Sequence, residues 1–266
     1  MPEGNELHRH AERQAEFFAG RRVTVHAPNG RFEAGAQQLT GRTLRAVHAY
    51  GKHLFYDFGR NRQLHVHLGL YGKFRDGEMP FPEPKGALRV RLFSSEHWLE
   101  LRGPTACDVL SDAERGNLLG RIGPDPLRED ADPAVAINRI LASRTPIAAL
   151  LMDQSVISGI GNIYRAELLY RARLDPFAPG RSLPRRALRK LWQDAQVLMR
   201  DGMIDRRIVT TRPKDRPHPQ GKARRGETHY VYRRRGLPCF VCSAAVLTQV
   251  FVGRKLYWCP VCQTGP

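Results

Sequence analysis

The first residues of the chain are the first candidates for chemistry. The sequence begins MPEGNE, and Pro2 is small enough for the initiator methionine to be removed. The free proline amine could then attack a sugar C1′ and form an iminium ion, an electron sink for later eliminations. Such a reaction needs an acid beside the amine, and Glu3 and Glu6 are both near. Taken alone, these acids equally fit the ordinary role of complementing a helix dipole.

Four cysteines near the end of the chain form a second candidate site. They occur as two Cys-x-x-Cys pairs, Cys239 with Cys242 and Cys259 with Cys262, with sixteen residues between the pairs. Two knuckles that each supply two thiolates predict a tetrahedral zinc site. Because the protein would fill all four positions, this zinc is predicted to be structural.

The segment between the cysteine pairs, LTQVFVGRKLYW, predicts a β-hairpin. Gly253 marks the turn, which places Arg254 at the hairpin tip, where its side chain is suited to contact a phosphate. The fifth cysteine, Cys107, has no partner in the sequence and is predicted to be a small core residue.

The composition indicates the kind of partner. The chain has 266 residues, which favours two domains, and its 41% hydrophobic content supports packed cores. The formal net charge of +17 implies an anionic partner, such as nucleic acid, an acidic membrane or an acidic protein. No apolar run reaches the roughly 20 residues of a transmembrane helix, and the N-terminus lacks the apolar region of a signal peptide. We therefore expect an intracellular nucleic-acid-binding protein with no membrane partner.

Hydrophobic periodicity predicts an N-terminal helix followed by a β-rich domain. Leu7, Ala11, Ala15 and Phe18 share one face of a helix over residues 5–19. Short strand-like runs follow at residues 22–26, 44–49, 53–58, 63–68, 87–92 and 98–101. This spacing predicts a β-sandwich or barrel-like domain over residues 1–125.

The pattern becomes helical beyond this boundary. Asp132-Pro133 and Thr145-Pro146 each predict an N-cap followed by proline at the first helical position. Residues 206–235 carry 11 Lys and Arg against 2 acids, which fits either a solvated loop or phosphate contacts. The predicted fold is therefore α+β and multidomain, with a helical domain over 126–236 and a zinc finger over 237–266. Its helices are predicted at about 133–142, 146–153, 162–172 and 184–201.

Four ordered motifs resemble the Fpg/Nei family of bifunctional DNA glycosylases and AP lyases along nearly the full chain. They are MPEGNELHR at the start, GKHL around Lys52, SGIGNIY around Asn162, and GR at 253–254 followed by WCPVCQ. The resemblance implies an N-terminal helix with a β-sandwich, a helical domain with a helix–two-turn–helix, and a zinc finger with four cysteine ligands. It also implies damaged DNA as partner, structural Zn²⁺ as the one cofactor, a monomer, and a place in the bacterial cytoplasm at the nucleoid.

The resemblance assigns catalytic roles to the first residues. It makes Pro2 the Schiff-base nucleophile and Glu3 the general acid/base that helps to open the sugar and release the base. Glu6 matches a supporting carboxylate. The implied reaction is release of the damaged base, followed by strand cleavage through β,δ-elimination.

The resemblance also assigns the residues that hold DNA. Lys52 assists β-elimination and positions the abasic strand, although by itself it would be an ordinary surface lysine. Asn162 and Arg254 bind the phosphates that flank the lesion, and Arg254 also assists δ-elimination. Asn162 follows GIG and opens a helix, so backbone N–H groups would face an anion there. Without the family, a plain N-cap would explain Asn162.

A glycosylase must extrude the damaged nucleotide and fill the gap that it leaves. In the segment HLGLYG at 67–72, Leu70 and Tyr71 are candidate wedges, with ordinary core packing as the alternative. Gly69 stands where the Nei branch carries Gln, so a DNA contact of that side chain is lost here. Arg121 matches a DNA-contacting arginine of the Nei branch.

These features favour a Nei-type enzyme, similar to the actinobacterial endonuclease VIII-like group. That resemblance implies oxidised pyrimidines, such as thymine glycol, and abasic sites as substrates. Two alternatives stay open: an Fpg-type glycosylase for oxidised purines, and a non-catalytic zinc-finger DNA-binding protein.

Overall fold

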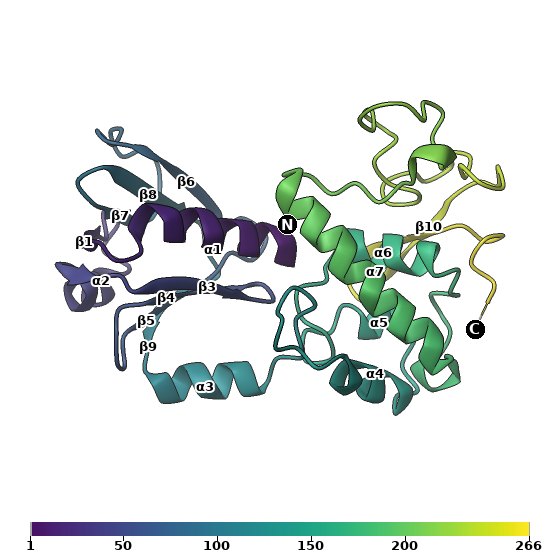
Figure 1. Cartoon of the computed structure of the whole chain (residues 1–266), viewed down its shortest axis with the longest axis horizontal. Helices are drawn as coiled ribbons and strands as arrows, with labels where there is room; N and C mark the ends of the chain where they lie inside the picture. Colours follow the sequence, from purple (N-terminus) through teal and green to yellow (C-terminus); the bar gives the residue numbers. More distant parts are fainter. Residues whose placement is uncertain (1, 266) are drawn as a thin grey trace. The chain divides into compact units, whose positions relative to one another are not determined.

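The computed structural model describes residues 2–265 and divides into two compact units (Figure 1). The first unit comprises Met1–Arg121 and the second Ile122–Pro266. Within the described residues, no helix is both long and apolar enough to cross a membrane. The separation of a zinc-finger domain over 237–266 stays a prediction, because these residues cluster with the helical unit.

The first unit is built around an N-terminal helix, α1 (Gly4–Phe18), and two antiparallel sheets, with two further helices described below. The predicted β-sandwich is therefore confirmed. The five-stranded sheet has the order β2 (Arg42–Thr43), β1 (Arg22–His26), β7 (Leu88–Phe93), β8 (His97–Arg102), β6 (Lys73–Glu78). The four-stranded sheet has the order β3 (Ala46–Tyr50), β4 (His53–Asp57), β5 (Gln63–His67), β9 (Ala106–Leu110).

Alternation of side chains builds the core of this unit. In β4, Leu54 and Tyr56 are buried in the hydrophobic core, where the predicted face of α1 also packs. Helix α1 ends at Phe18, and Gly20 follows with φ of +78°, a conformation that favours glycine. Cys107 is buried in the same core, as predicted, and burial raises the pKa of its thiol to about 12.

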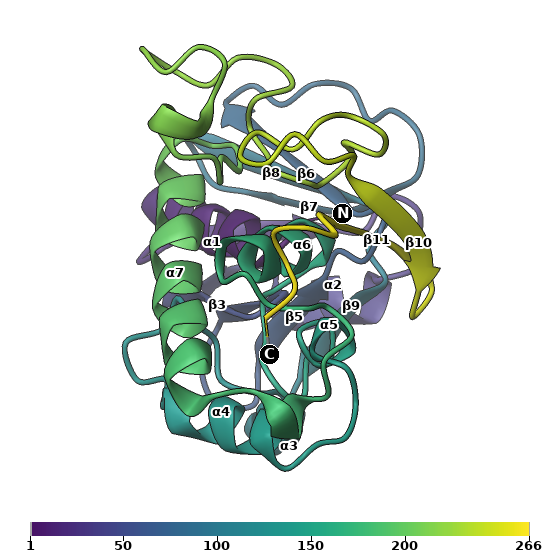
Figure 2. The same ribbon diagram turned by 90° about the vertical axis from the view of Figure 1, so that its right-hand side faces the viewer.

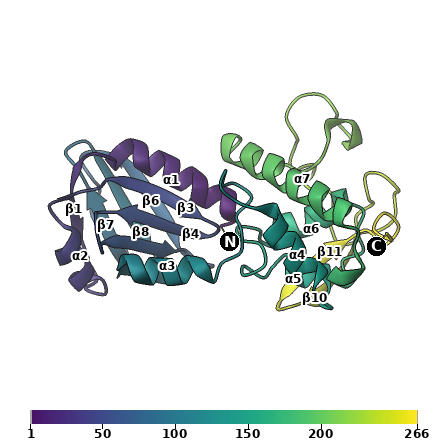
Figure 3. The same ribbon diagram turned by 60° about the horizontal axis from the view of Figure 1, so that its bottom comes forward.

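Two helices of the first unit have no counterpart in the sequence prediction, α2 (Glu33–Leu39) and α3 (Asp112–Gly120). Helix α3 buries none of its residues, so it carries no apolar stripe that periodicity could detect. A capping box between Ser111 and Glu114 fixes its start instead. Helices α1 and α3 lie on opposite sides of the strands (Figure 3).

The second unit is helical, as predicted. Asp132 caps the first of its helices through a side-chain hydrogen bond to Ala134 N, and Pro133 follows at the first helical position. The corresponding prediction for Thr145 is wrong, because α5 is a single turn with Pro146 at its N-cap and no side-chain cap. The helices are α4 (Pro133–Leu141), α5 (Ile147–Leu150), α6 (Asn162–Arg171) and α7 (Arg185–Ile204), with short 3₁₀ helices η1 (Gly180–Ser182) and η2 (Pro213–Asp215).

Helix α6 lies between α7 and a two-stranded hairpin, β10 (Leu247–Phe251) and β11 (Arg254–Trp258) (Figure 2). This arrangement confirms the predicted hairpin. Its two-residue turn, Val252 and Gly253, has positive φ at both positions, as the hairpin turn with the matching twist requires. Leu256 of β11 is buried in the same core as α6 and α7, so the hairpin is attached to the helical unit.

The basic stretch over 206–235 is anchored to α6 by one buried carboxylate. Glu167 accepts hydrogen bonds from the backbone N–H groups of Tyr230, Val231 and Tyr232 at 2.7, 2.9 and 2.8 Å. Its Oε2 also accepts a hydrogen bond from the Thr210 hydroxyl. Both ends of the stretch are therefore held at the same point of the helical unit.

Candidate active site

A small pocket in the first unit gathers residues from three separate parts of the chain. It has a volume of about 20 Å³ and is lined by Pro2, Leu7, Lys52, His67, Leu68 and Gly69. Pro2 stands just before α1, and Lys52 lies in the two-residue turn between β3 and β4. Gly51 begins that turn with φ of +56°. The predicted nucleophile and the predicted catalytic lysine therefore share one pocket.

The two predicted acids lie in different environments. Glu3 is only 3% exposed and is the N-cap residue of α1, directly after Pro2. Glu6 is more exposed, and its carboxylate lies 3.8 Å from Nε2 of His10. The contact with His10 lowers the pKa of Glu6. Glu3 is thus the carboxyl buried beside Pro2, whereas Glu6 pairs with the next turn of its own helix.

The loop after β5 presents its apolar residues to solvent. Leu70 is 46% exposed and Tyr71 is 83% exposed, which excludes the core-packing alternative for both. Gly69 has φ of +65°, and a Cβ at this position would lie 1.8 Å from Oγ1 of Thr105. The loop conformation therefore requires glycine at 69, and a Gln here would both strain the backbone and collide with Thr105.

In the second unit, the structure connects Asn162 to the hairpin that carries Arg254. Asn162 is the first residue of α6, and Gly161 occupies the N-cap position, so the plain N-cap alternative for Asn162 is wrong. Its Nδ2 donates a hydrogen bond to the carbonyl of Lys255 at 3.0 Å. The guanidinium of Arg165, which is fully buried, donates to Oδ1 of Asn162 and to the same carbonyl. The amide of Asn162 and the backbone beside Arg254 are thus held together.

Arg254 pairs with Phe251 across the hairpin, directly after the two-residue turn, so it lies at the predicted tip. Arg121, the last residue of the first unit, is the exposed C-cap residue of α3. Its Nε donates to the carbonyl of Asn117 at 3.3 Å. The guanidinium of Arg121 is therefore presented at a helix end with solvent access.

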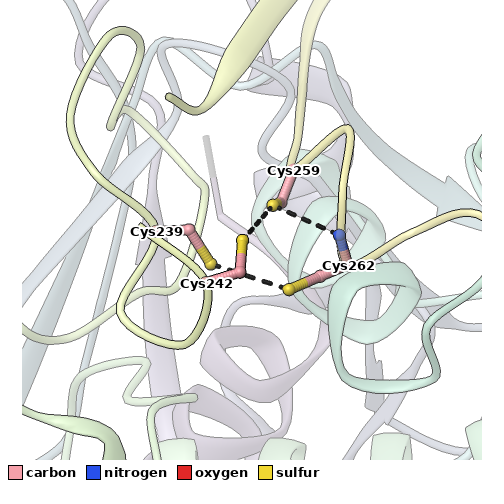
Figure 4. A group of neighbouring side chains, drawn as sticks. All are labelled: Cys239, Cys242, Cys259 and Cys262. Atoms are coloured by element: carbon pink, nitrogen blue, oxygen red, sulfur yellow. Dashed lines mark hydrogen bonds between the residues drawn. The ribbon is translucent and has the colours of Figure 1, made fainter. Parts of the chain in front are cut away.

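The four cysteines converge as the spacing predicted (Figure 4). All four sulfur atoms lie within 4.8 Å of one another, with 3.4 Å between Cys242 and Cys259 and 3.9 Å between Cys239 and Cys262. Tetrahedral zinc with Zn–S bonds of about 2.3 Å separates its sulfurs by about 3.8 Å. The backbone N–H of Val241 points at Cys239, and that of Cys262 at Cys259. The cluster can therefore bind a metal ion.

Sequence reasoning missed two features close to these residues. His53, His65 and His67 form a row of rings that ends at the Pro2 pocket. The spacing His-x-His within a predicted strand could have indicated a shared face, because strand residues alternate. Glu167 was also missed, and no local signal reveals it, since its partners lie 63–65 residues later in the chain.

Comparison with known proteins connects this architecture to DNA repair. Residues 1–104 match the formamidopyrimidine-DNA glycosylase N-terminal domain, and residues 122–213 match the formamidopyrimidine-DNA glycosylase H2TH domain. Endonuclease 8 1 of Mycobacterium tuberculosis is 47% identical over 269 residues, covering 99% of this chain and all of that protein. Formamidopyrimidine-DNA glycosylase of Thermus thermophilus is 33% identical over the full length of both chains.

A solved structure shows the same fold. Lactococcus lactis Fpg, in a complex with DNA that contains an abasic site, superposes with a TM-score of 0.80 at 22% identity, covering 98% of this chain and 99% of that one. The fold and the matched domains define a DNA glycosylase with AP lyase activity, an enzyme of base excision repair. The chain belongs to the Fpg/Nei family, which comprises the formamidopyrimidine-DNA glycosylases and endonuclease VIII.

Proposed function

We propose that the amine of Pro2, exposed by removal of Met1, is the nucleophile of this glycosylase and lyase. The observation that carries the proposal is the shared pocket of Pro2 and Lys52, which brings an amine nucleophile beside a cation. The amine attacks C1′ of the damaged nucleotide, and the buried carboxyl of Glu3 protonates the sugar oxygen as the ring opens. The bond from C1′ to the damaged base then breaks, and the base leaves with the amine proton as the C=N⁺ bond of the iminium ion forms. Glu6 supports this carboxyl from the first turn of α1.

Elimination then breaks the strand on both sides of the sugar. The iminium ion acidifies the C2′ proton, so β-elimination expels the 3′ phosphate, and δ-elimination expels the 5′ phosphate. Lys52 neutralises phosphate charge in the first step and Arg254 in the second. Each step moves one proton to a base and one electron pair to the departing phosphate.

The protein would act as a monomer without a small-molecule cofactor, and its remaining assigned residues would bind the damaged DNA. The net charge of +17 supports binding to the phosphate backbone. Asn162 and Arg254 hold the phosphates that flank the lesion, and their common attachment through Lys255 supports joint action. Arg121 adds a contact from α3. The four cysteines would bind Zn²⁺. This ion would be structural, because four thiolates leave no open position for catalysis.

The lesion that this enzyme removes is proposed to be an oxidised pyrimidine. The 47% identity to an endonuclease 8, against 33% to a formamidopyrimidine-DNA glycosylase, favours the Nei branch. Leu70 and Tyr71 are exposed enough to enter the duplex where the nucleotide leaves. Gly69 supplies the turn that presents them and contributes no side chain to the DNA.

Matched cleavage assays test this lesion class. Duplexes with thymine glycol are expected to be cleaved at least about tenfold faster than duplexes with 8-oxoguanine opposite cytosine, since about one to two kcal/mol separate related pocket ligands. The salt concentration has to be equal in both arms, because phosphate contacts make binding depend on salt. Abasic-site DNA serves as the control for active enzyme. Faster cleavage of 8-oxoguanine would assign the chain to the purine-specific alternative.

Removal of zinc is expected to release the hairpin from the helical unit. The segment after residue 237 is short, so metal binding supplies much of its folding free energy. Without the metal, Arg254 loses its scaffold, and affinity for abasic-site DNA should fall at least tenfold, about 1.4 kcal/mol. Zinc content by atomic absorption, hairpin order by amide exchange, and DNA affinity are measured on the same sample. Unchanged affinity in verified zinc-free protein would contradict this role.

A further inference from the structure

Three histidines form a connected row on the outer face of the four-stranded sheet. His53 of β4 is paired in register with His67 of β5, and His65 lies two residues before His67, so their side chains share one face. The ring centroids of His53 and His67 are 4.8 Å apart, and those of His53 and His65 are 5.1 Å apart. Because His67 also lines the Pro2 pocket, the row leads directly to the proposed nucleophile.

Packing fixes the row from the side away from the pocket. Nδ1 of His53 and Nε2 of His65 are 2.9 Å apart, a hydrogen bond that two neutral rings make with one N–H and one lone pair. The ring of His65 stacks on Phe55 at 5.3 Å, and the guanidinium of Arg115 covers Phe55 at 5.3 Å. His53 is therefore held in place, and its ring in turn confines the ring of His67.

A metal site does not explain the row. Among residues 2–265, the four cysteines are the one group of three or more possible ligands whose donor atoms converge. Nδ1 of His53 and Nε2 of His65 already bind each other, which removes one donor atom from each ring. The row is better explained by an effect on the neighbouring pocket.

The surroundings keep these histidines uncharged at neutral pH. Burial, followed by the charge of Lys52, lowers the pKa of His67. Burial lowers the pKa of His53 to about 3 and that of His65 to about 4. Asp108 acts in the opposite direction on the pKa of His65. The titratable and charged groups around the row come from the N-terminus, the β3–β4 segment, β9 and α3: Pro2, His48, Tyr50, Lys52, Asp108 and Arg115.

We propose that His67 carries a proton for Pro2 and that His53 and His65 are positioning residues that keep His67 neutral and oriented. This inference rests on the proposed role of Pro2. His67 takes one proton from the protonated proline nitrogen, whose lone pair then attacks the C1′ aldehyde carbon of an abasic sugar. The second amine proton passes to the resulting alkoxide, which gives a carbinolamine. The imidazolium of His67 protonates that hydroxyl, and water leaves as the C=N⁺ bond forms.

The test is borohydride trapping on abasic-site DNA under single-turnover conditions, with saturating protein, from pH 5 to pH 8. His67→Gln is expected to slow trapping roughly a hundredfold at pH 7, the usual contribution of a proton-transfer group. His65→Gln removes the hydrogen bond that holds His53, which loosens the packing that buries His67, so the pKa of His67 should rise toward its ordinary value. At pH 8 this variant should be trapped as fast as wild type. As the pH is lowered, its trapping rate should fall at a pH about one unit higher than that at which the wild-type rate falls.

The matched control is His26→Gln, an exposed histidine of β1 on the other sheet. It should leave the rate and the pH profile unchanged. Circular dichroism checks the fold of each variant. If His67→Gln does not fold, the proposal is tested by the acid side of the pH profile of trapping in His65→Gln. Wild-type trapping speed in His67→Gln, or an equal loss at every pH in His65→Gln, would overturn the proposal. Failure of the proposed function looks different, because wild type itself would then form no adduct.

Discussion

Protein that carries an extension before Pro2 is expected to form no covalent adduct with abasic-site DNA, whereas protein trimmed to Pro2 is trapped by borohydride. The nitrogen of Pro2 in a peptide bond shares its lone pair with the carbonyl, so it cannot add to an aldehyde. The loss of trapping should be at least about a thousandfold, since the covalent step itself disappears. Intact mass identifies the N-terminus of each preparation, and the adduct is measured on a denaturing gel.

Two variants test whether blocking the amine of Pro2 is itself the cause of that loss. Pro2→Gly leaves a primary amine at the same place, so it should retain measurable trapping. Lys52→Ala removes the other amine of the pocket, yet the adduct should still form, at a reduced rate. An adduct that persists in the extended protein and disappears in Lys52→Ala would make Lys52 the nucleophile. No adduct with trimmed wild type would favour the non-catalytic DNA-binding alternative.

The fold was largely predictable because its main elements carry strong local signals. Leu7, Ala11 and Phe18 repeat at helical spacing, and all three are buried in the core of the first unit. Alternation is clear in β1, where Val23 and Val25 are buried between more exposed residues. Elements without a buried stripe leave no such signal, and α3, which buries none of its residues, was missed for that reason. The predicted cap at Thr145 failed because the first N–H groups of α5, those of Ile147 and Ala148, donate to the backbone carbonyls of Ala178 and Pro176, so no side-chain cap is needed.

The candidate site was predictable from the residues alone only where a short sequence motif indicates the chemistry. The cysteine spacing is such a motif, and the four sulfur atoms do converge. The neighbourhood of Pro2 and Lys52 depends instead on how α1 packs beside the β3–β4 turn, and the sequence reached it only through family resemblance. The exposure of Leu70 and Tyr71 could not be predicted from their apolar character, since an exposed leucine or tyrosine and a buried one are indistinguishable in a sequence.

Removal of the carboxylate at Glu167 is expected to be the most destabilising single change in the second unit. Glu167 is completely buried and accepts three backbone N–H groups, those of Tyr230, Val231 and Tyr232, besides the hydroxyl of Thr210. In Glu167→Ala the three backbone N–H groups are left without this partner, and each such group costs about 1–3 kcal/mol. We expect a loss of roughly 4 kcal/mol in the free energy of unfolding, measured by urea denaturation. The basic stretch that Glu167 anchors should also become open to trypsin.

The isosteric variant Glu167→Gln keeps the size of the side chain. It therefore tests whether the charge and the second acceptor oxygen contribute to stability in addition to packing. Its carbonyl can still accept from Val231 and Tyr232, but its NH₂ group faces the N–H of Tyr230. We expect a loss of about 2–3 kcal/mol, because two donors then oppose each other in a buried place. Asp201→Asn, an exposed acid on α7, is the matched control and should change neither stability nor trypsin cleavage. Wild-type cleavage of residues 206–235 in both Glu167 variants would show that the stretch is held by its own contacts, such as Thr211 to Glu227, and not by α6.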